Sequence, residues 1–408
     1  MNRKEIPSLL FRFSLIAVAA TLPLSIYANS IAIILLTFSW ILEGNIFAKL
    51  RDITHRPLII FFLFFYALFI LGMLYTENIP VGKFNLEKKI SLFVLPLILG
   101  TSQFFNESIK QTVLKFFVAS CFIASLICLG NGFYKYFFYQ DSSYFFYMNL
   151  TSILDSHAIY FSMYVCFSIF ILLSFLKNNF LVLKRHQKFF LFLIIFYFFC
   201  FIILLSARMV LVFLFFSHAI GGTYFSYKKR GLIAWFIILT LSSTAVVVIA
   251  NRSVFLRERV TKLFESDFSA SPDKGNANGL TIRLVKWQCS FEGIKDHLLL
   301  GTGTGDSQDY LNKCYERKNF WGQYPAYHFN SHNQYLETAL TLGLAGLTFL
   351  LSCMIMPLVF AIRKKQILFI SFLLLFAFNS LTESLLERQQ GIVFFTFFIS
   401  LFSFNRSS

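Results

Sequence analysis

The sequence predicts an all-α polytopic membrane protein with about twelve transmembrane helices and one long loop outside the bilayer. Hydrophobic residues account for 57% of the 408 residues and charged residues for 14%, against roughly 25% charged residues in a typical soluble domain. Apolar stretches of bilayer-spanning length, roughly 17–25 residues, recur from one end of the chain to the other. Too few polar side chains remain to cover a water-soluble body, so the composition excludes a soluble globule.

The apolar stretches place the predicted helices in order along the chain. Residues 189–225, as a single helix, would extend about 55 Å, nearly twice the ~30 Å hydrocarbon core. We therefore expect this stretch to turn back at Ser206-Ala207-Arg208. The predicted spans are 9–28, 30–48, 57–75, 89–105, 112–135, 157–176, 189–206, 209–226, 231–250, 339–362, 367–383 and 391–404.

The orientation of the spans follows from the short basic loops, because cytoplasmic loops of membrane proteins collect Lys and Arg. Both termini and the loops 49–56, 177–188, 228–230 and 363–365 carry such residues and are predicted to be cytoplasmic. One outer loop, with Lys83, Lys88 and Lys89, breaks this trend. It is either a local exception or a place where anionic headgroups bind. The first span is expected to act as an uncleaved anchor.

The long segment 251–337 is predicted to lie outside the membrane and to carry the functional site. It holds eleven Lys or Arg and ten Asp or Glu, so its net charge is +1 and the remaining +15 lies elsewhere. A nucleic-acid partner would need a clustered basic face and is not expected. The predicted organisation is therefore spans one to nine in 1–250, the loop in 251–337 and three spans in 338–408. Cys289 and Cys314 lie in this loop, where an oxidising compartment would permit a disulfide, and both the paired and the free state stay open.

Two arginines are candidate ligands of an anionic group. Arg208 lies between two spans and is either an interfacial anchor or a fixed guanidinium that faces a lipid-borne phosphate. In a helix over 281–296, Arg283 and Trp287 share one face with Lys286 beside them, which would suit a diphosphate and its sugar or be a solvated face. The Gly301–Asp306 run lacks the Lys-Ser/Thr ending of a P-loop and is predicted to be a turn-rich loop.

The candidate base is His332. Ser331 is predicted to cap the following helix, which places His332 in the first helical turn at the mouth of the membrane. A neutral imidazole there could accept a proton, although a structural role is the alternative. Glu383, Glu387 and Arg388 between the last two spans either pair with one another or complete the site wall, and His157 is similarly placed. Asn333 and Tyr335 follow His332 and are further wall candidates.

These motifs, taken in order, resemble the O-antigen ligase and polymerase superfamily, most closely over residues 200–400. They are Ser206-Ala207-Arg208, Arg283 with Trp287, the Gly301–Asp306 turn, His332-Asn333-x-Tyr335-Leu336 with Gly343-Leu-x-Gly346-Leu, and Leu381-Thr-Glu383-Ser. The resemblance implies an integral-membrane glycosyltransferase of the C type in the bacterial inner membrane, with a periplasmic site and no nucleotide sugar, metal or cofactor. It also implies that Arg208 and Arg283 bind undecaprenyl diphosphate and that His332 deprotonates the acceptor sugar.

The expected reaction moves a glycan from undecaprenyl diphosphate to a sugar hydroxyl of the lipid A core and inverts the anomeric centre. An O-antigen or capsule polymerase, whose acceptor is another lipid-linked repeat, is the alternative. A transporter of lipid-linked oligosaccharides is a third hypothesis, which is disfavoured because the two halves of the chain show no similarity. The enzyme hypothesis requires both arginines and His332 to meet just above the lipid headgroups.

Overall fold

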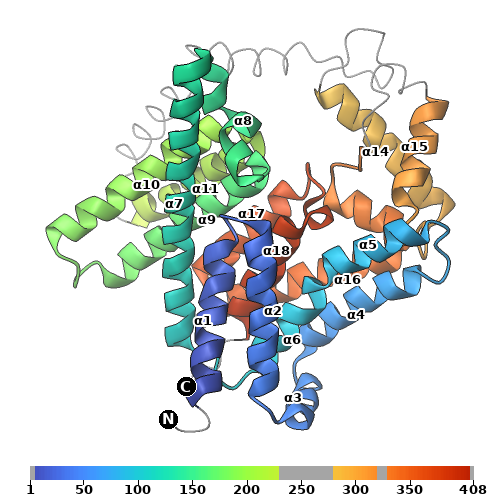
Figure 1. Ribbon diagram of the computed structural model, residues 1–408, viewed down its shortest axis with the longest axis horizontal. Coiled ribbons are helices and arrows are strands. Elements are labelled where there is room, and N and C mark those ends of the chain that lie inside the picture. The colour runs from blue at the N-terminus through green and yellow to red at the C-terminus, as the bar shows by residue number, and fades with distance from the viewer. Residues whose placement is uncertain (1–4, 229–278, 319–328, 405–408) are drawn as a thin grey trace. The chain divides into compact units, whose positions relative to one another are not determined.

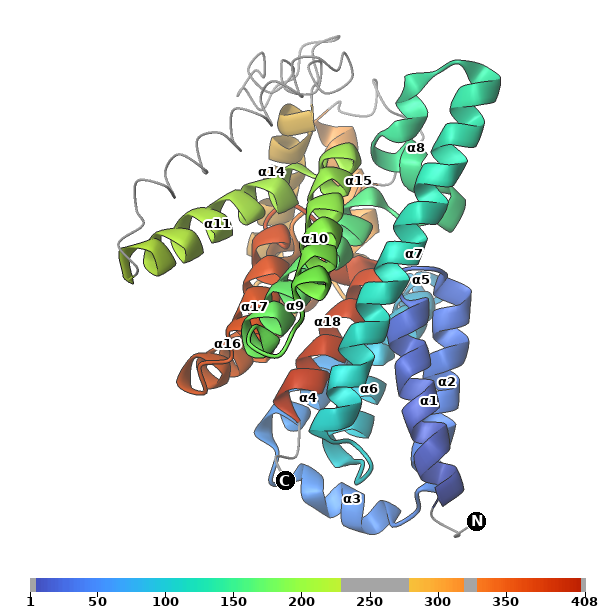
Figure 2. The same ribbon diagram turned by 90° about the vertical axis from the view of Figure 1, so that its left-hand side faces the viewer.

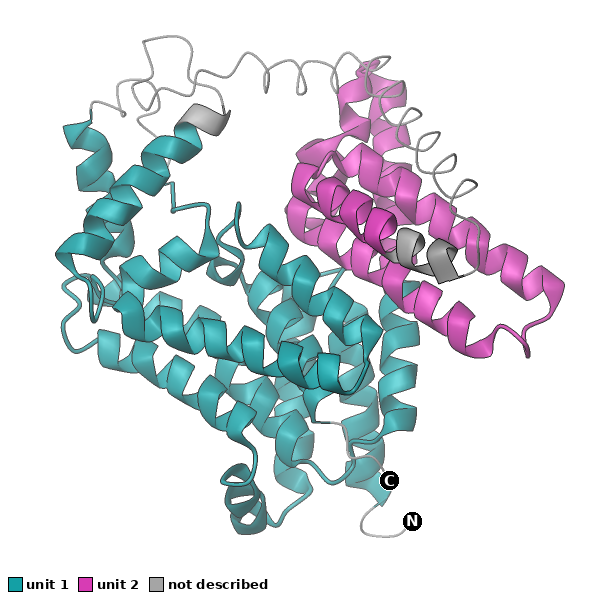
Figure 3. Ribbon diagram, turned by 180° about the vertical axis from the view of Figure 1, so that it is seen from behind, with its two compact units in different colours: residues 1–120, 267–408 teal, residues 121–266 magenta. Residues whose placement is uncertain are grey.

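The computed structural model describes residues 5–228, 279–318 and 329–404, and these residues form helices and contain no β-strand (Figure 1). The all-α class predicted from the sequence is confirmed. The chain divides into two compact units, residues 1–120 with 267–408 (unit 1) and residues 121–266 (unit 2), as coloured in Figure 3.

Unit 1 joins the two ends of the chain. Its elements are α1 (Glu5–Thr21), α2 (Ile26–Leu42), α3 (Ile46–Ile53), α4 (Pro57–Gly72), α5 (Ile79–Lys89), α6 (Ser91–Thr101), the first part of α7 (Glu107–Tyr139), α14 (Gly279–Asp296), α15 (Ser307–Arg317), α16 (Gln334–Arg363), α17 (Ile367–Asn379), the 3₁₀ helix η4 (Leu385–Glu387) and α18 (Gln389–Ser403).

Packing in unit 1 pairs early helices with late ones. α1 and α2 lie side by side in both Figure 1 and Figure 2, α4 packs on α16, and α6 packs on α18. α18 is buried from Gln390 to Phe402, and its Phe394 and Phe398 rings contact Phe117 of α7 and Phe372 of α17. An aromatic core around α18 therefore fixes the late helices against the early ones.

Unit 2 contains the remainder of α7, the 3₁₀ helices η1 (Ser142–Phe145) and η2 (Ser152–Leu154), α8 (Tyr147–Thr151), α9 (Ala158–Asn179), α10 (Arg185–Leu205) and α11 (Arg208–Lys228). α9 packs against α8, α10 and α11. The helix break predicted at Ser206-Ala207-Arg208 is confirmed, and the turn back across the membrane stays a prediction. Ser206 takes a positive φ of 51° and donates its backbone N–H to the Ile203 carbonyl, and α11 begins at Arg208.

The predicted ends of the first two spans are wrong. α1 ends at Thr21 and α2 begins at Ile26, whereas the sequence predicted a boundary near residue 29. α2 ends at Leu42 because Gly44 and Asn45 take left-handed φ values of 74° and 53°, a conformation that terminates helices. α3 then leaves at 107° to α2. The predicted second span extended to residue 48 and so included the first residues of α3, although Lys49, Arg51 and Asp52 make this helix mixed in character.

Four described helices are long and apolar enough to cross a membrane, namely α7, α9, α10 and α16, and the bent pair α2 and α3 would be a fifth. α4, α17, α18 and the first part of α11 are apolar but shorter. These helices identify a membrane protein. The twelve-span topology is not confirmed and stays a prediction, and the predicted span 231–250 lies outside the described residues.

Candidate functional site

Glu383 lies at the centre of a cluster of charged side chains in unit 1. Its Oε1 accepts a hydrogen bond from Arg283 Nη2 at 3.2 Å, and its Oε2 lies 3.2 Å from His332 Nδ1. The Glu383 side chain is 11% exposed, whereas those of Arg283 and His332 are 30% and 31% exposed. The carboxylate is therefore buried, whereas the Arg283 and His332 side chains are partly exposed and open to a ligand.

The segment before α16 positions His332, but not as the sequence predicted. Asn333, rather than Ser331, caps α16, and its side-chain oxygen accepts a hydrogen bond from the Tyr335 backbone N–H at 3.0 Å. Asn and Ser are comparably good caps, and here the Ser331 N–H instead donates to Glu337 Oε2 at 2.8 Å. His332 thus precedes the helix, with a φ of 45° that is uncommon outside glycine.

Lys286 adds positive charge beside Arg283 on α14. The side chain is almost completely buried, and its Nζ lies 3.8 Å from the centre of the Phe329 ring, a cation–π contact. Burial and the nearby Arg283 lower the pKa of Lys286 to about 7, although Glu383 acts in the opposite direction. Two basic side chains and one carboxylate leave the cluster with an excess of positive charge when Lys286 is protonated, which suits an anionic ligand.

Trp287 offers a hydrogen-bond donor four residues from Arg283. α14 confirms the helix predicted over 281–296, so the two residues lie one turn apart on neighbouring positions of its surface. The buried Nε1 of Trp287 has no hydrogen-bond partner in the described part of the chain. Buried donors without a partner are uncommon in proteins, and an acceptor group on a ligand would satisfy this one.

Two other predicted wall residues have different surroundings. The Tyr335 hydroxyl donates to the Ala377 carbonyl at 2.9 Å and ties α16 to α17. Arg388 is exposed just before α18. The predicted pairing of Arg388 with Glu383 and Glu387 is wrong, because Glu383 contacts Arg283 and His332 and because Glu387 contacts lysines of α5.

Glu387 forms a second ionic cluster that the sequence analysis missed. Lys89 Nζ lies 2.8 and 2.9 Å from its two carboxylate oxygens, and Lys88 Nζ lies 3.5 Å from Oε2. Although burial favours the neutral acid, Lys89 and Lys88 keep the pKa of Glu387 below its usual value. Two of the three lysines that break the positive-inside trend thus pair with a carboxylate inside unit 1. Their anomalous position was the signal that could have revealed the cluster.

The Gly301–Asp306 turn docks into a break in α16. The helix is interrupted at Gly343, whose φ and ψ are 65° and −162°. Thr302 N–H donates to the Leu340 carbonyl at 2.8 Å, and Leu344 N–H donates to the Leu298 carbonyl at 2.9 Å. The turn therefore satisfies backbone groups that the break would leave without partners.

The turn also contacts α4 and the residues that join α4 to α5. Thr304 Oγ1 donates to the Phe69 carbonyl at 2.6 Å. Asp306 accepts hydrogen bonds from the backbone N–H groups of Glu77 and Asn78 at 2.9 and 2.8 Å. The glycine-rich motif is thus a structural connection between α4, α5 and α16, as expected for a turn-rich loop.

Two links fasten α14 in the same region. A disulfide, which the sequence left open, joins Cys289 of α14 to Cys314 of α15, and Val285, Leu311, Tyr315 and Leu340 pack around it. Ser290 Oγ lies 2.8 Å from Ser331 Oγ, beside His332. These links set the position of Arg283 and Lys286 relative to His332.

Arg208 and His157 belong to unit 2, so their predicted approach to the Glu383 cluster stays a prediction. Arg208 is the half-buried first residue of α11. His157 caps α9, and its Nδ1 accepts a hydrogen bond from the Ile159 N–H at 3.3 Å. A capping role accounts for His157 without catalysis.

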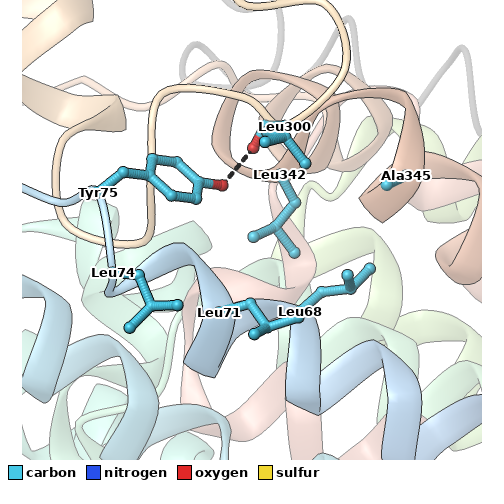
Figure 4. Close-up of a pocket in the computed structure, with 7 residues that line it drawn as sticks. All are labelled: Leu68, Leu71, Leu74, Tyr75, Leu300, Leu342 and Ala345. Carbon is cyan, nitrogen blue, oxygen red and sulfur yellow. Dashed lines mark hydrogen bonds between the residues drawn. The ribbon is translucent and has the colours of Figure 1, made fainter.

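An apolar hollow lies beside the broken part of α16 (Figure 4). The Tyr75 hydroxyl, which donates to the Leu300 carbonyl at 2.5 Å, is at its rim. This hollow has the character of a hydrocarbon contact, not of a catalytic centre. The other lining residues are Leu68, Leu71, Leu74, Leu342 and Ala345.

The apolar helices identify a membrane protein, and the cluster around Glu383 brings Arg283, Lys286 and His332 together in unit 1. Residues 191–351 match the family model described as O-antigen ligase, which confirms the resemblance to the O-antigen ligase and polymerase superfamily. Members of this family are glycosyltransferase-like enzymes. A search of curated proteins gave no significant match. The matched segment includes Arg208, Arg283 and His332, whereas Glu383 lies beyond it.

Proposed function

We propose that the protein is an O-antigen ligase-like glycosyltransferase of the bacterial inner membrane. It would transfer a glycan from undecaprenyl diphosphate to a sugar hydroxyl of the lipid A core on the periplasmic side. The observation that carries this proposal is that Arg283 and His332 share the carboxylate of Glu383. The match of residues 191–351 to the O-antigen ligase family supports it.

The reaction requires one base and a set of cations. The acceptor oxygen forms a bond to the anomeric carbon of the donor sugar while the bond from that carbon to the diphosphate breaks. The acceptor proton passes to His332, and the electron pair of the broken bond leaves on the diphosphate. Arg283 and Arg208 stabilise this charge, since a guanidinium binds phosphate oxygens through two parallel hydrogen bonds. Direct displacement inverts the anomeric centre.

The neighbouring side chains assist in defined ways. Lys286 supplies further positive charge once an anion is bound, and Trp287 Nε1 offers a donor to the diphosphate or the sugar. Asn333 fixes the start of α16 and with it the backbone of His332. Because ATP is not supplied outside the inner membrane, the free energy for transfer has to come from the activated lipid-linked donor.

The proposal is tested with purified protein in detergent, a lipid-linked glycan donor and a lipid A core acceptor. We expect His332→Ala to slow transfer by about 10²–10⁴-fold, the usual contribution of a general base. Arg283→Ala should slow transfer by about 10²–10³-fold. Arg208→Lys should slow transfer less than Arg208→Ala if the positive charge matters more than the planar, bidentate shape of the guanidinium. Lys313→Ala, on the exposed surface of α15, is the matched control and should transfer normally.

Two results would contradict the proposal. Unimpaired transfer by His332→Ala would remove the base, and the lack of any covalent product would favour a transporter. A gene deletion distinguishes the polymerase alternative. Loss of a ligase leaves polymer on the carrier lipid, whereas loss of a polymerase leaves single repeats attached to the core.

A further inference from the structure

We propose that Glu383 is a positioning residue that couples donor binding to the base. It orients His332 and binds Arg283 before the donor arrives. Once the donor diphosphate binds Arg283, Glu383 stabilises the protonated form of His332 more strongly. This inference rests on the proposed function and adds a role that the sequence did not assign, because Glu383 was predicted only as part of the site wall.

The first step is the orientation of the imidazole. An ionised carboxylate can only accept hydrogen bonds, so the 3.2 Å contact to Glu383 Oε2 places the proton of neutral His332 on Nδ1. The lone pair then lies on Nε2. This nitrogen is therefore the atom that takes the acceptor proton, and the carboxylate fixes both the tautomer and the ring orientation.

The second step is that Arg283 and His332 contact the same carboxylate. Oε1 contacts Arg283 while Oε2 contacts His332. The Glu383 side chain is 11% exposed, and electrostatic interactions at such a site are stronger than in water. Arg283 therefore offsets part of the negative charge that His332 experiences.

The third step is the exchange of partners for Arg283. A diphosphate carries more negative charge than a carboxylate and accepts hydrogen bonds in the same planar geometry. When the guanidinium moves towards it, Arg283 offsets less of the charge of Glu383, which therefore stabilises more strongly the imidazolium that forms as His332 takes the proton. The base is thus strengthened at the moment when a donor is in place, and after transfer the imidazolium returns its proton to water.

The prediction concerns Glu383→Gln, which keeps the size of the side chain and removes its charge. We expect kcat to fall by about 10²–10⁴-fold, since the base loses its tautomer and its counter-charge. The KM for the donor should fall as well, because the amide no longer competes with the diphosphate for Arg283. Glu383→Asp keeps the charge and should recover part of kcat.

A direct binding measurement makes the test independent of turnover. Undecaprenyl diphosphate, added without acceptor to the purified protein, should bind more tightly to Glu383→Gln than to the wild type. The matched control is Glu316→Gln, the same change at an exposed position of α15, which should leave kcat, KM and binding unchanged.

The proposal is overturned if Glu383→Gln keeps the wild-type kcat, or if it weakens donor binding while kcat falls, as a purely structural role would predict. It would also be overturned if Glu383→Asp were no faster than Glu383→Gln. The proposed function fails in a different way, namely if His332→Ala transfers glycan at the wild-type rate.

Discussion

The buried amine of Lys286 makes the stability of the protein depend on pH. Its pKa is lowered to about 7 in the folded protein from an ordinary value of 10.5, with burial as the main cause. Between these two values the unfolded chain binds more protons than the folded one, so the free energy of unfolding rises with pH from about 7 to about 10.5. Below pH 7 the amine is protonated in both states, and the full cost of burying the charge remains.

Lys286→Met should therefore remove part of this pH dependence. We expect the variant to be more stable than the wild type near pH 7 and to lose that advantage as the pH rises towards ~10. The measurement is thermal unfolding in detergent over this pH range. Lys313→Met, at an exposed lysine of α15, serves as control. Its unfolding temperature should change with pH in the same way as that of the wild type. A Lys286→Met curve parallel to the wild type would contradict the assigned pKa.

The residues of the cluster were more predictable than their contacts. Helical spacing correctly placed Arg283 and Trp287 one turn apart, because that pattern is local. The error at Ser331 arose because Ser and Asn are both good caps, and the Ser331 hydroxyl instead contacts Ser290 of α14. Glu383 lies 51 residues from His332 and 100 from Arg283, so its two partners follow from tertiary packing, which no local pattern encodes.

At the scale of elements, the break in α16 and the turn before α15 depend on each other. A Cβ atom added at Gly343 would lie 2.3 Å from the carbonyl atoms of Leu299, and one at Gly301 would lie 2.4 Å from the Thr341 carbonyl carbon. Both glycines also have positive φ values, 65° and 73°, which side chains disfavour. The turn can dock only where these side chains are missing.

Gly343→Ala is thus expected to push the turn away from α16. Backbone strain and the lost hydrogen bonds should destabilise the protein by about 1–3 kcal/mol, and transfer should slow because α14 and α16 no longer hold Arg283 and His332 in register. Gly130→Ala in α7 is a suitable control, since nothing lies within 4 Å of its added Cβ. Thermal unfolding and transfer assays together check both effects, and equal behaviour of the two variants would refute the docking argument.

At the scale of the whole chain, contacts within unit 1 bring together the segments that the sequence assigned to the outer face. Asp306 binds the backbone at Glu77 and Asn78, and Glu387 binds Lys88 and Lys89. These four contacts join described residues of segments that the sequence predicted to lie on one side of the membrane. The contacts support the shared side, which stays a prediction, and hydropathy could not predict where each helix bends.

The disulfide and an exposed residue of the first of these loops test the orientation. If the outer face is periplasmic, Cys289 and Cys314 will be oxidised in cells and will react with alkylating reagents only after reduction. A membrane-impermeant maleimide should label Glu77→Cys in intact spheroplasts, because this position is exposed beside the Asp306 turn. Lys364→Cys, exposed in the predicted cytoplasmic loop after α16, should react only after lysis. Labelling of Lys364→Cys but not Glu77→Cys in intact spheroplasts would place the Glu383 cluster in the cytosol, where a periplasmic acceptor could not reach His332.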